Sequence, residues 1–193
     1  MKTFRFLLFM FSVTLIVLSC SKSSPQTSSY TTQPSPNDGI PIHTARSVQA
    51  IVTKVVDGDT LKVTFNDNST DTIRILGIDT PETHAANKPN EYAEITDLDC
   101  LKTWGNRATE FAFNTLNRRE VTIESDPIAP ERGYFDRLLA YVRINGNDFG
   151  SLLLEKGLAR VYEEGDSSRK QDYFQMERKA KESVIGLWGC SSN

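Results

Sequence analysis

Residues 51–78 read IVTKVVDGDTLKVTFNDNSTDTIRILGI, and this stretch decides the fold. Three runs within and just before it, 48–56, 60–65 and 70–78, are rich in β-branched residues, which favour strands. An Asp-Gly-Asp turn separates the first two runs, and residues 66–69 form a polar turn between the second and third. Three short strands joined by tight turns predict an antiparallel meander.

The rest of the chain alternates between helix-like and strand-like patterns. Apolar residues recur at helical spacing in three segments, and β-branched runs predict further strands between them. Five short strands with interspersed helices predict a mainly β (α+β) domain built on a small, partly open barrel. The expected elements are a polar loop at 79–102, helices at 103–117, 149–156 and 167–184, and strands at 120–125, 138–144 and 158–162.

The first twenty residues have the pattern of an export signal. Lys2 and Arg5 precede an apolar run at 6–18, which is shorter than the ~18 or more residues expected of a membrane-spanning helix. The run ends in Val-Leu-Ser-Cys, which resembles a bacterial lipobox, with Cys20 as the lipidated first residue of the mature protein. We therefore expect residues 1–20 to be a lipoprotein-type signal peptide, and the mature protein to be held on a bacterial membrane, in the envelope or at the cell surface; plain secretion is the alternative.

Residues 21–46 are dominated by Ser, Thr and Pro and contain few large apolar side chains. Such a segment cannot bury enough surface to offset the entropy lost on ordering, so we expect a disordered tether in which His43 is exposed. Residues 47–193 remain for a single folded domain, which we expect to be monomeric.

Several common catalytic arrangements are missing from the sequence. It has no G-x-S-x-G, G-x-G-x-x-G, Walker or H-E-x-x-H motif. With two histidines and no C-x-x-C pair, a zinc site or a His-dependent nucleophile is poorly supplied. Catalysis would therefore depend on carboxylates, arginines or a bound cation.

Carboxylates gather at the turns of the predicted meander. Asp57 and Asp59 flank a glycine, while Asp79, Thr80 and Glu82 follow the third strand. Antiparallel pairing would place Asp59 near Asp79, and two carboxylates with a backbone carbonyl and waters suit a hard cation such as Ca²⁺. The alternative is that Asp-Gly-Asp is an ordinary turn.

Two arginines interrupt apolar strands. Arg74 alternates with Leu76 and Ile78, which are expected to face inward, and a buried guanidinium needs an anion as its partner. Arg137 opens a second apolar strand. Two arginines converging on one anion would favour phosphate, whereas exposed surface charges are the alternative interpretation of each.

Taken together, these motifs resemble the staphylococcal nuclease (thermonuclease) family in order and spacing. The resemblance covers about residues 50–188 and implies a five-stranded OB-fold β-barrel with three helices. The segments that carry it are VDGDT at 56–60, IRILGIDTPE at 73–82, RLLAYV at 137–142 and GLA at 157–159.

The resemblance also implies a Ca²⁺ site. Asp59 and Asp79 would bind the ion through their carboxylates and Thr80 through its backbone carbonyl. Asp57 would lie next to these ligands without contacting the ion directly. All four positions hold the residue types that the family pattern requires.

A phosphodiesterase site is implied as well. Glu82 would act on the attacking water as general base or as its orienter, and Arg74 and Arg137 would bind the scissile phosphate. The implied activity is Ca²⁺-dependent endonucleolytic hydrolysis of DNA and RNA, with little sequence specificity and with 3′-phosphate and 5′-hydroxyl ends. The alternative is a catalytically silent OB-fold module that binds nucleic acid or a protein partner; the complete Arg–Asp–Glu set favours the enzyme.

The sequence departs from the family pattern beside the site. Residues 134–136 read Tyr-Phe-Asp where many members have a basic residue, Tyr and Gly, and Tyr162 is followed by two glutamates at 163–164. Tyr134 and Tyr162 remain candidate substrate contacts, whereas the acids are expected to weaken the grip on a polyanion. The loop at 83–102 is also longer than in the best-known member.

Charge and cysteine content add two expectations. The net charge of −3 argues against a broad basic surface for nucleic acid, so binding away from a local site formed by Ca²⁺ and two arginines should be weak.

With Cys20 assigned to lipidation, Cys100 and Cys190 remain in a chain that we expect to be exported. We expect these two cysteines to form a disulfide; free buried thiols are the alternative.

Overall fold

The computed structural model describes residues 46–190. The predictions for the signal peptide, for lipidation of Cys20, for His43 and for nearly all of the tether lie outside the described residues. Within the described part of the chain, no helix has both the length and the apolar character needed to cross a membrane.

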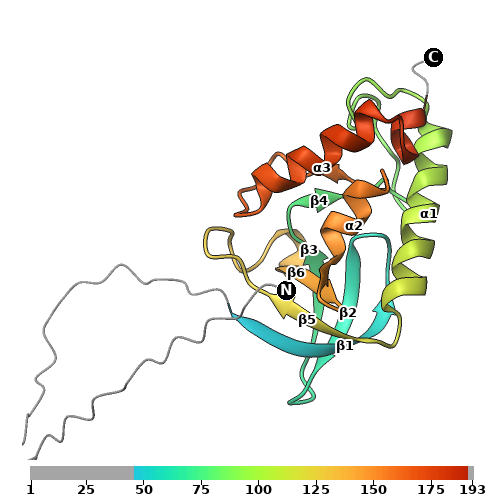
Figure 1. Ribbon diagram of the computed structural model, residues 1–193. Coiled ribbons are helices and arrows are strands. Elements are labelled where there is room, and N and C mark those ends of the chain that lie inside the picture. The colour runs from blue at the N-terminus through green and yellow to red at the C-terminus, as the bar shows by residue number, and fades with distance from the viewer. Residues whose placement is uncertain (1–45, 191–193) are drawn as a thin grey trace, which may run out of the picture. The chain divides into compact units, whose positions relative to one another are not determined.

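A closed five-stranded barrel forms the centre of the domain (Figure 1). Its strands follow the order β3-β2-β1-β5-β6, and a parallel pairing of β3 with β6 closes the circle. This confirms the predicted OB-fold barrel, but the expectation that it is partly open is wrong, because β3 and β6 pair. The strands are β1 (Ser47–Val55), β2 (Thr60–Phe65), β3 (Thr70–Ile75), β5 (Glu120–Glu124) and β6 (Leu138–Ile144), with a short β7 (Asn147–Asp148) beside β6.

The predicted third strand at 70–78 is wrong as one continuous element. β3 ends at Ile75, and Gly77 adopts φ +81°, which turns the chain out of the barrel. Beyond it, β4 (Ile78–Asp79) pairs with β8 (Arg160–Val161) in a separate two-stranded sheet. Ile75 and Leu76 before the break and Ile78 after it are all buried, so the apolar pattern continues across Gly77 and hydropathy alone does not reveal the break.

The described residues contain three α-helices, as expected (Figure 1): the first two contact barrel strands, and the third packs against the second helix and β8. The first begins five residues before the predicted start because the Asp97 side chain caps it, accepting a hydrogen bond from the Cys100 amide at 2.9 Å. Asp148 caps the second helix in the same way. The helices are α1 (Leu98–Leu116), α2 (Phe149–Glu155) and α3 (Lys170–Glu182), with 3₁₀ turns at Tyr134–Asp136 and Gly186–Gly189.

Small residues let α1 approach the two segments that carry the acidic motifs at 57–59 and 79–82. A β-carbon at Gly105 would lie 2.3 Å from the Pro81 carbonyl oxygen, and one at Gly58 would lie 2.8 Å from the Ala108 β-carbon. Such distances are not tolerated, so α1 needs glycine at both contacts. The helix thereby holds the Asp-Gly-Asp turn and the loop after β4 in place.

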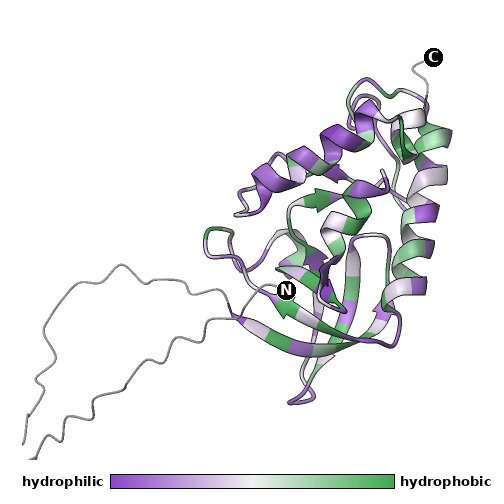
Figure 2. Cartoon of the chain, viewed as in Figure 1, coloured by the Kyte–Doolittle hydropathy of each residue, from purple (hydrophilic) through white to green (hydrophobic). Residues whose placement is uncertain are grey.

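The core consists mainly of aliphatic side chains from the inner faces of the strands and from α1 and α2. Figure 2 shows that α3, in contrast, is largely hydrophilic. It docks through the buried side chains of Tyr173, Glu177 and Ala180. Glu177 accepts a hydrogen bond from the Val161 amide at 2.9 Å, which satisfies its carboxylate and ties α3 to β8.

A smaller apolar cluster lies apart from the main core, under the long loop that precedes α1. It contains the buried residues Tyr92, Ile95, Leu101, Leu187 and Cys190. The predicted disulfide between Cys100 and Cys190 is present beside it and joins positions 90 residues apart. The chain-entropy model assigns a cross-link of this span about 4–5 kcal/mol of stability.

Candidate active site

The centre of the site is an ion cluster around Arg74, which lies opposite Thr60 in the β2–β3 ladder. One guanidinium nitrogen contacts Asp59 Oδ2, and Nη2 lies 2.5 Å from Asp79 Oδ1. The two aspartates therefore meet as expected, and the guanidinium between them finds the anionic partner that a largely buried arginine requires.

Asp59 is fixed by several further hydrogen bonds. The backbone amide and the hydroxyl of Thr80 donate to Asp59 Oδ2 at 2.8 and 2.9 Å, and the Thr60 hydroxyl donates to Oδ1 at 3.0 Å. Asp57 Oδ1 accepts from the Asp59 amide at 3.2 Å. These bonds join the Asp-Gly-Asp turn directly to the loop after β4.

The carboxylates at this site repel one another. Burial, reinforced by the negative charge of Asp59, raises the pKa of Asp57 from its ordinary 3.8 to about 6. The pKa of Asp79 is also raised, because burial and Asp59 outweigh the attraction of Arg74. In Asp59 itself burial is the largest effect, but Arg74 and the Thr80 hydrogen bonds overcome it and lower the pKa.

These properties fit a divalent cation. Asp59 and Asp79 offer hard carboxylate oxygens on either side of one positive group. Burial first, and then the charge of Asp59, raise the pKa of Asp57 and of Asp79, and a bound cation would oppose both effects. Over residues 46–190, no three His, Cys, Asp or Glu side chains form a cation site by themselves. The predicted set of two carboxylates and the Thr80 carbonyl would therefore be completed by water.

Glu82 lies three residues beyond Asp79, with its backbone pinned and its side chain exposed. The Asn87 side chain accepts from the Glu82 amide at 2.8 Å and donates to its carbonyl at 3.0 Å. Partial burial, together with the charges of Asp59 and Asp79, raises the pKa of the Glu82 carboxyl. A carboxylate with a raised pKa is a better proton acceptor near neutral pH.

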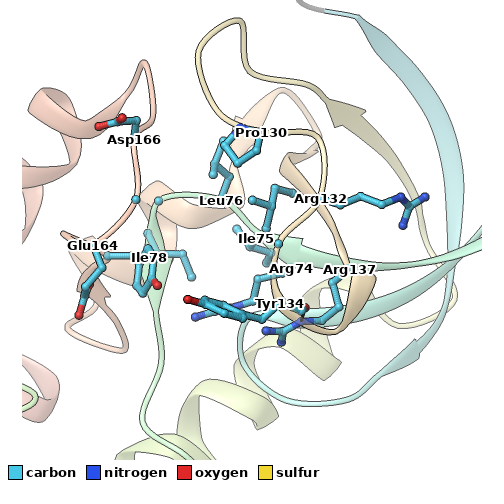
Figure 3. Close-up of a pocket in the computed structure, with 15 residues that line it drawn as sticks. Arg74, Ile75, Leu76, Ile78, Pro130, Arg132, Tyr134, Arg137, Glu164 and Asp166 are labelled. Carbon is cyan, nitrogen blue, oxygen red and sulfur yellow. Dashed lines mark hydrogen bonds between the residues drawn. The ribbon is translucent and has the colours of Figure 1, made fainter.

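A cavity of about 610 Å³ opens beside Arg74 and brings together the other predicted substrate contacts. Arg74, Arg137, Tyr134 and Tyr162 all line it. Arg137 also reaches the Thr60 hydroxyl at 3.4 Å, which places the two arginines next to each other. Figure 3 shows Arg74, Arg137 and Tyr134 grouped in one part of the cavity, with Glu164 well separated from them.

Two groups that contact Asp79 escaped the sequence-based prediction. Arg160 Nε lies 3.1 Å from Asp79 Oδ2, and the hydroxyl of Tyr92 donates to the same oxygen at 3.2 Å. Arg160 shows the same signal as Arg74, a charge inside a short apolar strand, whereas nothing in the sequence around Tyr92 indicates its position. Arg160 also binds Glu164 at 3.0 and 3.2 Å, so this acid is paired with a cation.

Comparison with known proteins agrees with this geometry. The family model described as "Staphylococcal nuclease homologue" matches residues 72–190, more than half of the chain. The chain belongs to the staphylococcal nuclease homologue family.

Several relatives of this staphylococcal nuclease homologue align over about three quarters of its length. An uncharacterized protein of Methanocaldococcus jannaschii is 42% identical over 74% of this chain and 72% of its own. Endonuclease YncB of Bacillus subtilis is 34% identical over 75% of this chain and 63% of its own. Thermonuclease of Staphylococcus intermedius is 28% identical over 74% of this chain and 77% of its own.

Burial and the neighbouring charge of Asp59 predict that the Asp57 carboxylate costs stability in the metal-free protein. Because its folded pKa lies above 3.8, the native state holds the proton more tightly, and stability falls as the pH rises from about 4 to about 6. Asp57→Asn should therefore be more stable than wild type at pH 7, by about 1–3 kcal/mol, and the difference should vanish near pH 4. Urea unfolding with EGTA present measures this.

Asp67→Asn is the matched control, because the pKa of this turn aspartate is lowered by its hydrogen bonds with Ser69. Its substitution should give no gain in stability at pH 7. An Asp57→Asn protein no more stable than wild type at that pH would contradict a raised pKa of Asp57 in the folded protein.

Proposed function

We propose that this chain is a Ca²⁺-dependent endonuclease that hydrolyses phosphodiester bonds in DNA and RNA with little sequence specificity. The observation that carries the proposal is the position of Arg74, which binds both aspartates and also lines the cavity that holds Arg137. Arg74 thus connects the two carboxylates that would hold a cation to the cavity in which the arginines would bind a phosphate. The names of the relatives, endonuclease and thermonuclease, support the same class of reaction.

Arg74 and Arg137 would bind the non-bridging oxygens of the scissile phosphate. Negative charge grows on these oxygens when water attacks, and two guanidinium groups already in place stabilise it without reorganisation. Arg74 is held by Asp59 and Asp79, and Arg137 by contacts from both sides, with Thr60 and with the Tyr134 carbonyl. Contacts limited to phosphate carry no sequence information, which accounts for broad specificity.

Glu82 would orient the attacking water and accept its proton. Its raised pKa suits proton transfer near neutral pH, and its backbone is fixed by Asn87 while the side chain remains exposed to solvent. In-line attack then expels the 5′ oxygen, which leaves 3′-phosphate and 5′-hydroxyl ends.

Asp59, Asp79 and the Thr80 carbonyl would hold the cation, with Asp57 behind them. When bound, Ca²⁺ shields the phosphate charge and favours the approach of a nucleophile. Tyr134 and Tyr162, which line the cavity, would contact the nucleotides.

We also propose that the protein is exported and held on a bacterial membrane through lipid on Cys20. The charged, then apolar, then lipobox-like order of residues 1–20 supports this proposal. The Cys100–Cys190 disulfide agrees with it, because such bonds persist in oxidising compartments.

Nuclease activity is tested by degradation of single- and double-stranded DNA and of RNA with Ca²⁺ or with EGTA. We expect cleavage with Ca²⁺ only, and Glu82→Gln and Arg74→Ala should each reduce the rate by about 100-fold or more. Glu155→Gln, a substitution of an exposed glutamate on α2, is the control and should cleave like wild type. A wild-type protein that binds DNA without cleaving it would favour the silent OB-fold module instead.

The anchor is tested by expressing the full chain in a bacterium and separating membrane from soluble fractions. Wild type should stay with the membrane until detergent is added, and Cys20→Ser should not carry lipid. Equal incorporation of labelled fatty acid into both proteins would refute lipidation at Cys20.

A further inference from the structure

The two oxygens of the Asp79 carboxylate have different surroundings. Oδ1 contacts Nη2 of Arg74, and Asp59 contacts Nη1 of the same guanidinium. Oδ2 accepts hydrogen bonds from Arg160 Nε at 3.1 Å and from the Tyr92 hydroxyl at 3.2 Å. A carboxylate oxygen has about two lone-pair sites, so these two donors saturate Oδ2 and leave accepting capacity on Oδ1.

Tyr92 is held rigidly enough to direct this carboxylate. Its side chain is only 1% exposed and packs in the small cluster with Ile95, Leu101 and Leu187. The Cys100–Cys190 disulfide covalently joins α1 to the C-terminal 3₁₀ turn at this cluster. The hydroxyl therefore has one fixed direction, toward Asp79.

Arg160 cannot direct the carboxylate in the same way, because its guanidinium is shared. Its Nη1 and Nη2 bind Glu164 at 3.2 and 3.0 Å, and only Nε reaches Asp79. Its guanidinium also lies 5.6 Å from the centre of the Tyr92 ring, so the tyrosine confines the arginine as well.

We propose that Tyr92 is a positioning residue: it turns the Asp79 carboxylate so that Oδ1, beside Asp59, is presented to the divalent cation. The inference rests on the proposed function, because it assigns Asp79 to that cation. Hydrogen bonds from groups behind a metal ligand fix its orientation, and their loss costs about 10–100-fold in metal affinity. The long loop before α1 therefore contributes to the site through a buried hydroxyl.

Tyr92→Phe tests the proposal because it removes a single oxygen and keeps the buried ring. Tyr141→Phe is the matched control: Tyr141 is equally buried, and its hydroxyl donates to an aspartate outside the site, Asp126, at 2.6 Å. Calorimetric titration of metal-free protein with CaCl₂, without nucleic acid, measures the dissociation constant. Melting temperatures of all three proteins show how much each lost hydroxyl affects folding.

We expect Tyr92→Phe to raise the Ca²⁺ dissociation constant about tenfold and Tyr141→Phe to leave it within twofold of wild type, although both lower the melting temperature. The Ca²⁺ concentration for half-maximal DNA cleavage should rise in Tyr92→Phe by the same factor. Unchanged Ca²⁺ affinity in Tyr92→Phe, or an equal loss in both variants, would overturn the positioning role alone. A wild-type protein that binds no Ca²⁺ would overturn the proposed calcium dependence, and the inference with it.

Discussion

The interaction on which the structure depends is the contact of one guanidinium, that of Arg74, with Asp59 and Asp79. It joins three segments: strand β3, the turn between β1 and β2, and strand β4. Without Arg74, two largely buried carboxylates would lose the cation that they share, and Asp59 would keep only neutral hydrogen-bond donors, which is costly in a medium of low polarity. The close contacts of α1 at Gly58 and Gly105 hold the turn between β1 and β2 and the loop after β4 next to each other.

The same arrangement explains how a protein with a net negative charge can bind a polyanion at a local site. Part of its acidic excess is committed within the fold: Glu164 pairs with Arg160, and Asp59 and Asp79 pair with Arg74. The net charge of −3 therefore says little about the cavity, where Arg74 and Arg137 lie next to each other. Net charge influences encounter with nucleic acid, whereas the local groups determine the chemistry.

The sequence predicted the barrel and the meeting of Asp59 with Asp79, because both follow from strand alternation and tight turns. It did not predict the break after β3, since a buried apolar run continues across Gly77. Nor did it predict Tyr92, because a loop residue reaches its partner only through tertiary packing, here around a disulfide that spans 90 residues. Arg160 could have been predicted from the sequence, because a charged residue within an apolar strand is the signal that singled out Arg74.

The central claim is that Asp59 and Asp79 hold a cation beside a phosphate bound by Arg74 and Arg137. The most direct measurement is a crystal structure of the protein with Ca²⁺ and a non-hydrolysable dinucleotide, in which anomalous scattering locates the ion. The account predicts an ion bound by both aspartate carboxylates, and phosphate oxygens within hydrogen-bond distance of both guanidinium groups. An ion bound elsewhere, or a phosphate that contacts neither arginine, would contradict it.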